Sequence, residues 1–269
     1  MSTQVFRSLH QGPGVLLLAN AWDAGSARLI ESLGAKAIAT TSAGLAWSRG
    51  YSDDNILPDG ELVSATREIA RVIRVPLTVD MEGGYSEDPS SVAELAARII
   101  DTGAAGINIE DGRGSKEILC AKIEAIRDRA ERSGVDLFIN ARTDVYLRGI
   151  ASGDAAIEET IARAARYRAA GCDGVFVPGL PDGAAILAIA AAIKPAPLNI
   201  MAVPGLPSID ALQKLGVRRL SAGSAIAQAA LGLTSRLATN FLAGEMGTLF
   251  NEVAAYSTMN KLFADSGRR

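Results

Sequence analysis

The chain has 269 residues, of which 48% are hydrophobic and 21% charged, and its formal net charge is −3. This length and composition suit one large domain with a single core. No basic stripe indicates a nucleic-acid surface, and no apolar run approaches the roughly 20 residues that cross a bilayer, so we expect neither kind of partner.

Cysteine and histidine usage narrows the possible chemistry. Cys120 and Cys172 show no disulfide or metal-ligand spacing, and the first residues show no signal-peptide pattern, so we expect a reduced, cytoplasmic protein. The single histidine, His10, excludes a histidine-rich zinc site. We expect His10 to be exposed in a leading segment rather than to take part in a Ser-His-Asp triad.

Short apolar runs alternate with helical stretches along the chain. In chain order we predict a strand at 15–20, a helix at 24–33, a strand at 36–41, and, after a longer excursion, a helix at 59–73. A strand at 76–81 and a helix opened by Asp88-Pro89 follow, then a strand at 105–110 and a helix at 115–132. The remaining pairs are strand 135–141 with helix 154–170, strand 173–177 with helix 182–193, strand 197–201 with helix 208–215, and a last strand at 218–221.

This alternation predicts the fold. Glycines that can close helices precede several strands, at Gly34, Gly103, Gly171 and Gly216. Strands that are nearly continuous apolar runs are typical of a parallel sheet buried on both faces. Eight strand–helix units favour an α/β fold of the closed (β/α)8 TIM type, forming one domain over residues 1–269. Residues from about 225 to 269 are predicted to be extra helix, and apolar residues spaced helically over 231–250 suggest an arm that packs on another subunit.

Polar residues follow the predicted strands, at the end of a barrel where chemistry is found. Asp80 and Glu82 alternate on one predicted strand, so we expect both side chains to point the same way, and Glu110 follows the next strand, with Arg142 beyond it. Clustered carboxylates are unfavourable unless a cation or shared protons neutralise them. Oxygen ligands without His or Cys select Mg²⁺ or Mn²⁺. The alternative is that these acids pair with arginines or cap helices.

Five motifs give the chain a resemblance to a known family. They are Ser42-Ala43-Gly44-Leu45, Gly50-Tyr51-Ser52-Asp53, Val79-Asp80-Met81-Glu82-Gly83-Gly84-Tyr85, Ile109-Glu110-Asp111 and Ala141-Arg142-Thr143-Asp144. In this order, over about residues 12–225, they resemble the isocitrate lyase/phosphoenolpyruvate mutase superfamily. Together they are specific for the superfamily and not for one reaction.

The resemblance implies roles for individual residues. Asp80 matches an acid that binds Mg²⁺ directly, and Asp53, Glu82 and Glu110 match acids that hold water ligands of the metal. The matches to substrate-binding residues comprise the loop that receives the substrate carboxylate, an arginine, an asparagine and an aromatic residue: Ser42, Gly44, Leu45, Arg142, Asn199 and Trp22.

The chain also departs from the superfamily pattern. The lyases carry a Lys-Lys-Cys-Gly-His loop after the fourth strand, whereas the corresponding segment here, Asp111 to Glu117, has neither Cys nor His. Cys120 lies further on, in the predicted helix, and does not replace it. The longer loop of the mutase branch is not matched either. The resemblance is therefore greatest to a branch associated with oxaloacetate or related 2-oxo acids.

These observations lead to a functional expectation. We expect a Mg²⁺-dependent carbon–carbon lyase that decarboxylates oxaloacetate, or cleaves a methylisocitrate-like substrate, through a metal-stabilised enolate. Arg142 would orient the substrate carboxylate, and the proton donor stays open among Tyr51, Tyr85, Lys116 and water. The alternatives are phosphonopyruvate-type P–C bond hydrolysis or rearrangement, and a non-catalytic 2-oxo-acid binding protein. The resemblance also implies a homotetramer that exchanges a C-terminal helix.

Overall fold

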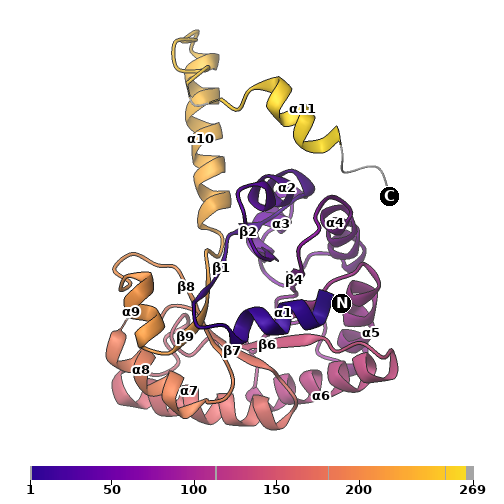
Figure 1. The fold of residues 1–269 in the computed structure, drawn as a ribbon, viewed down its shortest axis with the longest axis vertical. Coiled ribbons are helices and arrows are strands. Elements are labelled where there is room, and N and C mark those ends of the chain that lie inside the picture. The colour runs from indigo at the N-terminus through magenta and orange to yellow at the C-terminus, as the bar shows by residue number, and fades with distance from the viewer. Residues whose placement is uncertain (1, 113, 181, 252, 265–269) are drawn as a thin grey trace.

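The strands form a single parallel sheet that curls into a nearly closed barrel (Figure 1). The computed structural model describes residues 2–112, 114–180, 182–251 and 253–264. The first predicted strand consists of two consecutive pieces, β1 (Leu16–Leu18), which pairs with β9 (Val217–Ser221), and β2 (Asn20–Ala21), which pairs with β3 (Ile38–Thr40). Because β1 and β2 follow each other directly, they join the two ends of the sheet, and the predicted TIM-type barrel is confirmed.

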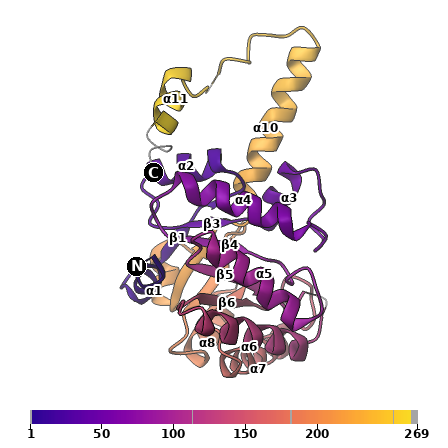
Figure 2. The same ribbon diagram turned by 90° about the vertical axis from the view of Figure 1, so that its right-hand side faces the viewer.

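The other strands and helices alternate as predicted, with helices on the outside of the sheet (Figure 2). The remaining strands are β4 (Leu77–Asp80), β5 (Gly106–Glu110), β6 (Phe138–Arg142), β7 (Gly174–Val177) and β8 (Leu198–Met201). The helices between them are α2 (Ala24–Ser32), α4 (Asp59–Val72), α5 (Pro89–Asp101), α6 (Lys116–Arg132), α7 (Gly153–Ala169), α8 (Gly183–Ala192) and α9 (Ile209–Lys214).

Helix ends follow the sequence signals. The Asp88 side chain accepts hydrogen bonds from the backbone N–H groups of Ser90 and Ser91, and Pro89 occupies the first helical position of α5. The glycines that precede β3, β5, β7 and β9 all adopt the left-handed conformation, as predicted for helix termini.

Two helices are additions to the predicted set: α1 (Ser2–Gln11) and α3 (Ser42–Ser48). The expectation of an exposed His10 is therefore wrong. His10 is 6% exposed, its Nδ1 lies 2.8 Å from the Phe6 carbonyl oxygen, and its ring stacks on Phe138 at a centroid distance of 4.2 Å. Phe6 and His10 lie one helical turn apart, so α1 presents both to the barrel. Burial lowers the pKa of His10 to about 3, which keeps the imidazole neutral.

The barrel interior has an apolar floor beneath a polar middle layer. At the amino-terminal ends of the strands, α1 inserts the fully buried Phe6 among side chains that include Phe138 and Leu18. The layer above is polar and hydrogen-bonded, and Arg219 donates to Asn108 Oδ1 at 3.0 Å. The other members of this layer are Asn140, Asn199 and Ser221.

The C-terminal region leaves the barrel. Helix α10 (Ala225–Leu242) projects away from the barrel, and helix α11 (Tyr256–Ala264) returns beside α2, where Arg28 Nε donates to the Leu262 carbonyl oxygen at 3.1 Å (Figures 1 and 2). The predicted helical pattern up to residue 250 is interrupted, since α10 ends at Leu242 and Gly244 has a φ of 84°. Among the described residues of α10, Ala227 alone is buried. No helix in the described ranges is long and apolar enough to cross a membrane.

The floor formed by α1 generates a stability prediction. Replacing Phe6 with alanine should lower the free energy of unfolding by about 3–5 kcal/mol, because the cavity it leaves is enclosed by the strands. Val5 is 51% exposed on the same helix, so Val5→Ala is a matched control expected to change stability by less than about 0.5 kcal/mol. Urea denaturation measures both values, and equal small losses would contradict the role of α1.

Candidate active site

A cavity of about 440 Å³ opens at the carboxyl ends of the strands. It lies over β4, β5 and β6, and of the predicted acids Asp53, Glu82 and Glu110 line it, whereas Asp80 interacts with Asp53 and Arg142 but is not among the described lining residues. The polar side chains that line it come from five separate segments of the chain: Ser42; Asp53, Asp54 and Asn55; Glu82 and Glu87; Glu110, Asp111, Ser115 and Lys122; and Arg142 and Arg148.

The acids at this end of the barrel differ in their surroundings. Asp80 ends β4, where its backbone N–H donates to Thr40 Oγ1 at 2.8 Å and its Oδ1 accepts from the Glu82 N–H at 3.3 Å. Glu82 Oε2 accepts from the Asn55 N–H at 2.6 Å, whereas Glu82 Oε1 is buried, and the buried Tyr85 hydroxyl lies close to this carboxylate. Glu110 pairs with Arg142 at 2.7 Å.

These carboxyl groups are held in a poorly solvated, negatively charged place. Burial is the main cause that raises the pKa of each of three acids, and the negative charges of neighbouring acids add to it. The pKa of Asp80 is raised, although Arg142 acts against the shift. The pKa of Glu82 rises to about 7 and that of Glu110 to about 8. Nearby protein cations therefore do not neutralise the cluster fully.

A divalent cation fits part of this arrangement. The mutual repulsion and the raised pKa values of these buried carboxyl groups are features that a hard cation would relieve. In the described part of the chain, however, no three His, Cys, Asp or Glu residues are close enough together to ligate one ion directly. The residues thus suit an ion such as Mg²⁺ that keeps most of its water ligands. Asp80 and Glu82 are the residues that would hold it, and Asp53 lies on the exposed rim of the cavity.

The placement of Glu82 corrects one expectation. Strand β4 ends at Asp80, so Asp80 and Glu82 do not alternate on a strand; Glu82 lies in a turn with a φ of 47°. The Asn55 side chain holds this turn, since its Oδ1 accepts from the backbone N–H groups of Gly83 and Tyr85 at 3.2 and 3.1 Å. A left-handed non-glycine residue is strained, and such strain is characteristic of functional sites.

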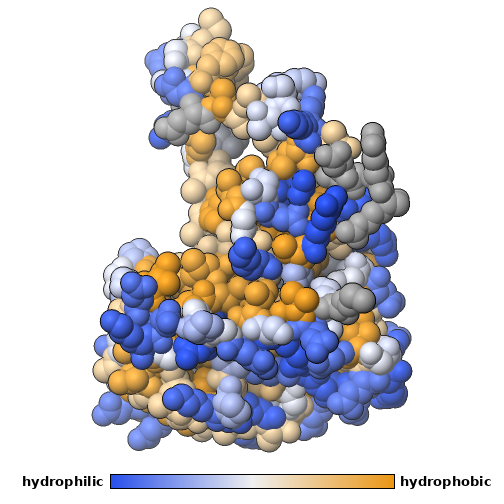
Figure 3. Space-filling view, viewed as in Figure 1, coloured by the Kyte–Doolittle hydropathy of each residue, from blue (hydrophilic) through white to orange (hydrophobic). Residues whose placement is uncertain are grey.

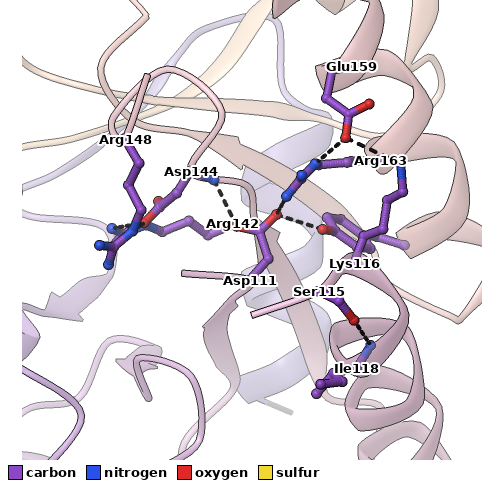
Figure 4. A network of polar contacts seen from close by, with 10 residues as sticks. Asp111, Ser115, Lys116, Ile118, Arg142, Asp144, Arg148, Glu159 and Arg163 are labelled. Carbon is purple, nitrogen blue, oxygen red and sulfur yellow. Dashed lines mark hydrogen bonds and ion pairs between the residues drawn. The ribbon is translucent and has the colours of Figure 1, made fainter. Parts of the chain in front are cut away.

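Arg142 is fixed by two acids, Glu110 and Asp144, and Figure 4 shows its pairing with Asp144. Besides Glu110, it donates to both oxygens of Asp144, at 2.6 and 3.1 Å. Asp144 is fully buried and also accepts from Arg148 Nε at 2.9 Å. Asp111 is neutralised separately, because its carboxylate accepts from Arg163 at 2.7 Å, from the Tyr167 hydroxyl at 2.6 Å and from the Asp144 N–H at 2.9 Å.

The predicted carboxylate-binding loop forms the start of α3. Ser42 lines the cavity, while Gly44 and Leu45 are buried within the helix. A Cβ atom at Gly44 would come within 3.0 Å of Thr41, Trp22 and Ala227, so only glycine fits there. Trp22 thus packs against the start of α3 at Gly44. It does not belong to the described residues that line the cavity.

Three other candidates lie away from the described lining of the cavity. Asn199 is 1% exposed in the barrel interior, where its amide donates to Ile200 O at 2.7 Å. The ammonium group of Lys116 pairs with Glu159 at 3.3 Å on α7 (Figure 4). Tyr51 packs against the hydrophobic core. Their selection rested on sequence position alone, which does not define the direction of a side chain.

Tyr85, the remaining candidate proton donor, has a buried hydroxyl near the acids. Burial and the charge of Glu82 raise its pKa far above the usual value, so the phenol stays protonated.

Sequence reasoning missed several cavity residues. Lys122, from α6, is 4% exposed and donates to the Gly83 carbonyl oxygen at 2.9 Å. Asn55 and Arg148 belong to no recognised motif. A charged residue on the apolar side of a predicted helix was the available signal for Lys122, and the four-residue spacing from Asp144 was the signal for Arg148.

The raised carboxyl pKa values predict how stability depends on pH. Folded Glu82 and Glu110 titrate near 7 and 8, whereas their ordinary value is 4.5, so between about pH 5 and 8 the folded state holds more protons than the unfolded state. Their contribution to the free energy of unfolding therefore falls as pH rises through this window. Urea titrations in EDTA should show a steeper fall for the wild type than for a Glu82→Gln/Glu110→Gln variant. Parallel profiles would contradict the assigned shifts.

Comparison with known proteins identifies the family. The family model described as phosphoenolpyruvate phosphomutase matches residues 6–242 of the chain. A Mycobacterium tuberculosis protein whose name assigns no activity is 39% identical over 81% of this chain and 81% of its own. An oxaloacetate decarboxylase of Pseudomonas aeruginosa is 30% identical over 86% of this chain and 82% of its own.

A crystal structure from Burkholderia cenocepacia, described as a candidate phosphonomutase, has a TM-score of 0.84 and 40% identity, covering 88% of this chain and 99% of that one. The chain therefore belongs to the phosphoenolpyruvate phosphomutase family, and it is an enzyme of the isocitrate lyase/phosphoenolpyruvate mutase superfamily of lyases and mutases.

Proposed function

We propose that this enzyme is a Mg²⁺-dependent lyase that acts on a small 2-oxo acid or a related carboxylate, by carbon–carbon cleavage or decarboxylation. The observation that carries the proposal is the group of buried, mutually repelling carboxyl groups at this end of the barrel, which burial and neighbouring negative charge hold at raised pKa values and which has Arg142 as its contacting cation. Mn²⁺ is the other ion that such an oxygen-only site would accept. When bound, the cation supplies positive charge that offsets the negative charge developing on the substrate carbonyl oxygen.

The residues of the chain would bind and orient the substrate. Arg142 is held rigid by Asp144 and Glu110, so its guanidinium can receive a substrate carboxylate at little entropic cost. Ser42 lines the cavity, so its hydroxyl can donate to the same carboxylate. The buried, protonated Tyr85 is positioned near the acids rather than on the cavity lining, so water is the better candidate to protonate a carbanionic product.

A second candidate reaction is P–C bond hydrolysis or rearrangement of a phosphonate. It is favoured by the names of the matching family and of the Burkholderia cenocepacia relative. A third possibility is a protein that binds 2-oxo acids without turnover, which the short segment after β5 would allow, because it lacks the Cys and His of the lyase loop.

Assays with a substrate panel separate these functions. With Mg²⁺ present, the purified protein is offered oxaloacetate, 2-methylisocitrate, isocitrate and phosphonopyruvate, and pyruvate, glyoxylate and phosphate release are measured. We expect cleavage of a carbon substrate that EDTA abolishes and that Asp80→Ala lowers by about 100-fold or more. Asp101→Ala, an exposed acid at the end of α5, is the control. Phosphate release alone would favour the phosphonate reaction, and activity insensitive to EDTA and to Asp80→Ala would contradict the proposed metal site.

We also propose that the enzyme is a cytoplasmic homotetramer, in which α10 and α11 pack on other copies. Cys120 and Cys172 are both free, which suits a reducing compartment. Apolar side chains gather across the middle of the face in Figure 3, near α1 and the start of α10. The projecting region exposes further large apolar side chains, namely Leu231, Phe241, Leu242, Met246 and Phe250. An exposed apolar surface of this kind is typical of a subunit interface.

Light scattering tests the assembly. We expect a mass about four times the 28.0 kDa of the chain. A Leu231→Glu/Leu242→Glu variant should give smaller species, because buried charge opposes association. Leu187→Glu is the matched control, since Leu187 on α8 is 51% exposed, like Leu231. A monomeric wild type would contradict the proposal.

A further inference from the structure

Three cationic side chains of the described residues line the cavity, and each of two of them lies close to two partners within the protein. Arg142 binds Asp144 and Glu110. Lys122 donates to the Gly83 carbonyl oxygen at 2.9 Å and lies 3.8 Å from Glu87. Both therefore stabilise the walls of the site, and a ligand would have to share them with these partners.

Arg148 is the third cation, and it is anchored at one edge only. Its Nε donates to Asp144 Oδ2 at 2.9 Å, and the buried Asp144 fixes the plane of the guanidinium (Figure 4). Within the described ranges its two Nη groups donate no hydrogen bond to the protein, and the side chain is 35% exposed. An anchored guanidinium with a free pair of donors matches the geometry of a carboxylate.

The free edge of Arg148 lies at the cavity. A Cβ atom at Gly112 would lie 3.9 Å from Arg148 Nη2 and 3.5 Å from Glu110 Oε1, so Gly112 leaves open the space between them. Gly112 and Arg148 both line the cavity, as does Arg142, which shares Asp144 with Arg148. A ligand that reaches from Arg142 toward Gly112 would therefore meet a second arginine.

We propose that Arg148 is a specificity-determining residue that binds a second, distal carboxylate, so that the enzyme takes dicarboxylic rather than monocarboxylic acids. The inference rests on the proposed function, which places the first carboxylate at Arg142 and Ser42. A distal carboxylate would occupy the two free Nη donors, whereas an alkyl group would leave them facing an apolar end. Charge pairing favours the diacid, and because the Arg148 side chain is 35% exposed, water that solvates its Nη groups keeps this preference moderate.

The test compares ligands that differ only at the last carbon. Calorimetry in the presence of Mg²⁺ measures the binding of 2-oxoglutarate against 2-oxovalerate, and of malate against 2-hydroxybutyrate, to the full-length protein. In at least one pair we expect the diacid to bind about 10- to 100-fold more tightly. Arg148→Gln should reduce that preference to about threefold or less and leave the affinity for the monoacid unchanged, while Arg148→Lys should keep part of it. Arg132→Gln, an exposed arginine on α6, is the control and should change neither affinity.

Each other outcome overturns one specific claim. No diacid preference in either pair, or an equal loss of mono- and diacid binding in Arg148→Gln, would refute the role of Arg148; the second result would mean that it only supports Asp144. If binding of both ligand types is indifferent to Mg²⁺ and to Asp80→Ala, the proposed metal-dependent function fails instead. Because one readout is the diacid preference and the other is the metal dependence, the two failures can be told apart.

Discussion

The site depends on an excess of buried negative charge at the carboxyl ends of β4 and β5. The barrel brings Asp80, Glu82 and Glu110 to one desolvated region, and Arg142 is the cation that contacts one of them. In water each carboxyl group would ionise at its ordinary pKa. Burial in the protein and the proximity of the other acids raise these pKa values. The fold tolerates this cost because the rest of the barrel is well packed, and a bound cation would remove it.

The layers beneath the site provide that support. Phe6 and Phe138 close the floor, and the polar layer of Asn108, Asn140 and Arg219 fills the middle of the barrel. In that layer Arg219 Nη2 donates to Asn108, while Arg219 Nε and Nη1 are buried without a partner among the described residues. The turn that carries Glu82 is held from the side by the Asn55 amide.

The pair Asp144–Arg148 extends this organisation toward the far end of the cavity. An arginine on a distal carboxylate would stabilise a charge that decarboxylation removes, so this contact favours cleavage reactions in which both carboxylates are retained.

The fold could be predicted closely from the sequence, because apolar runs, Asp88-Pro89 and the helix-closing glycines are local signals. Helix α1 was missed although its amphipathic spacing is a local signal, whereas the burial of Phe6 and His10 against the barrel is a tertiary contact. The meeting of Asp80, Glu82 and Glu110 followed from barrel topology. The turn at Glu82 did not follow, because it depends on Asn55, which lies 27 residues earlier.

Side-chain direction limited the prediction of the site further. Lys116 and Lys122 lie on the same helix, yet the first pairs with Glu159 and the second lines the cavity. Asn199 is at a strand position whose side chain points into the barrel, where its Oδ1 accepts from the Asn140 amide and its own amide donates to the Ser221 hydroxyl. Arg148 gains its importance from the buried Asp144, and burial of that carboxylate is not visible in the sequence.

The central claim is that the acids around Asp80 hold a divalent cation. Its most direct test is anomalous scattering from crystals grown with Mn²⁺ and a 2-oxo acid. The account predicts one strong peak beside the Asp80 carboxylate, facing Glu82 and Glu110, with the ligand carboxylate toward Arg142. A peak elsewhere in the barrel, or none while the acids stay paired only with arginine and backbone N–H groups, would contradict it.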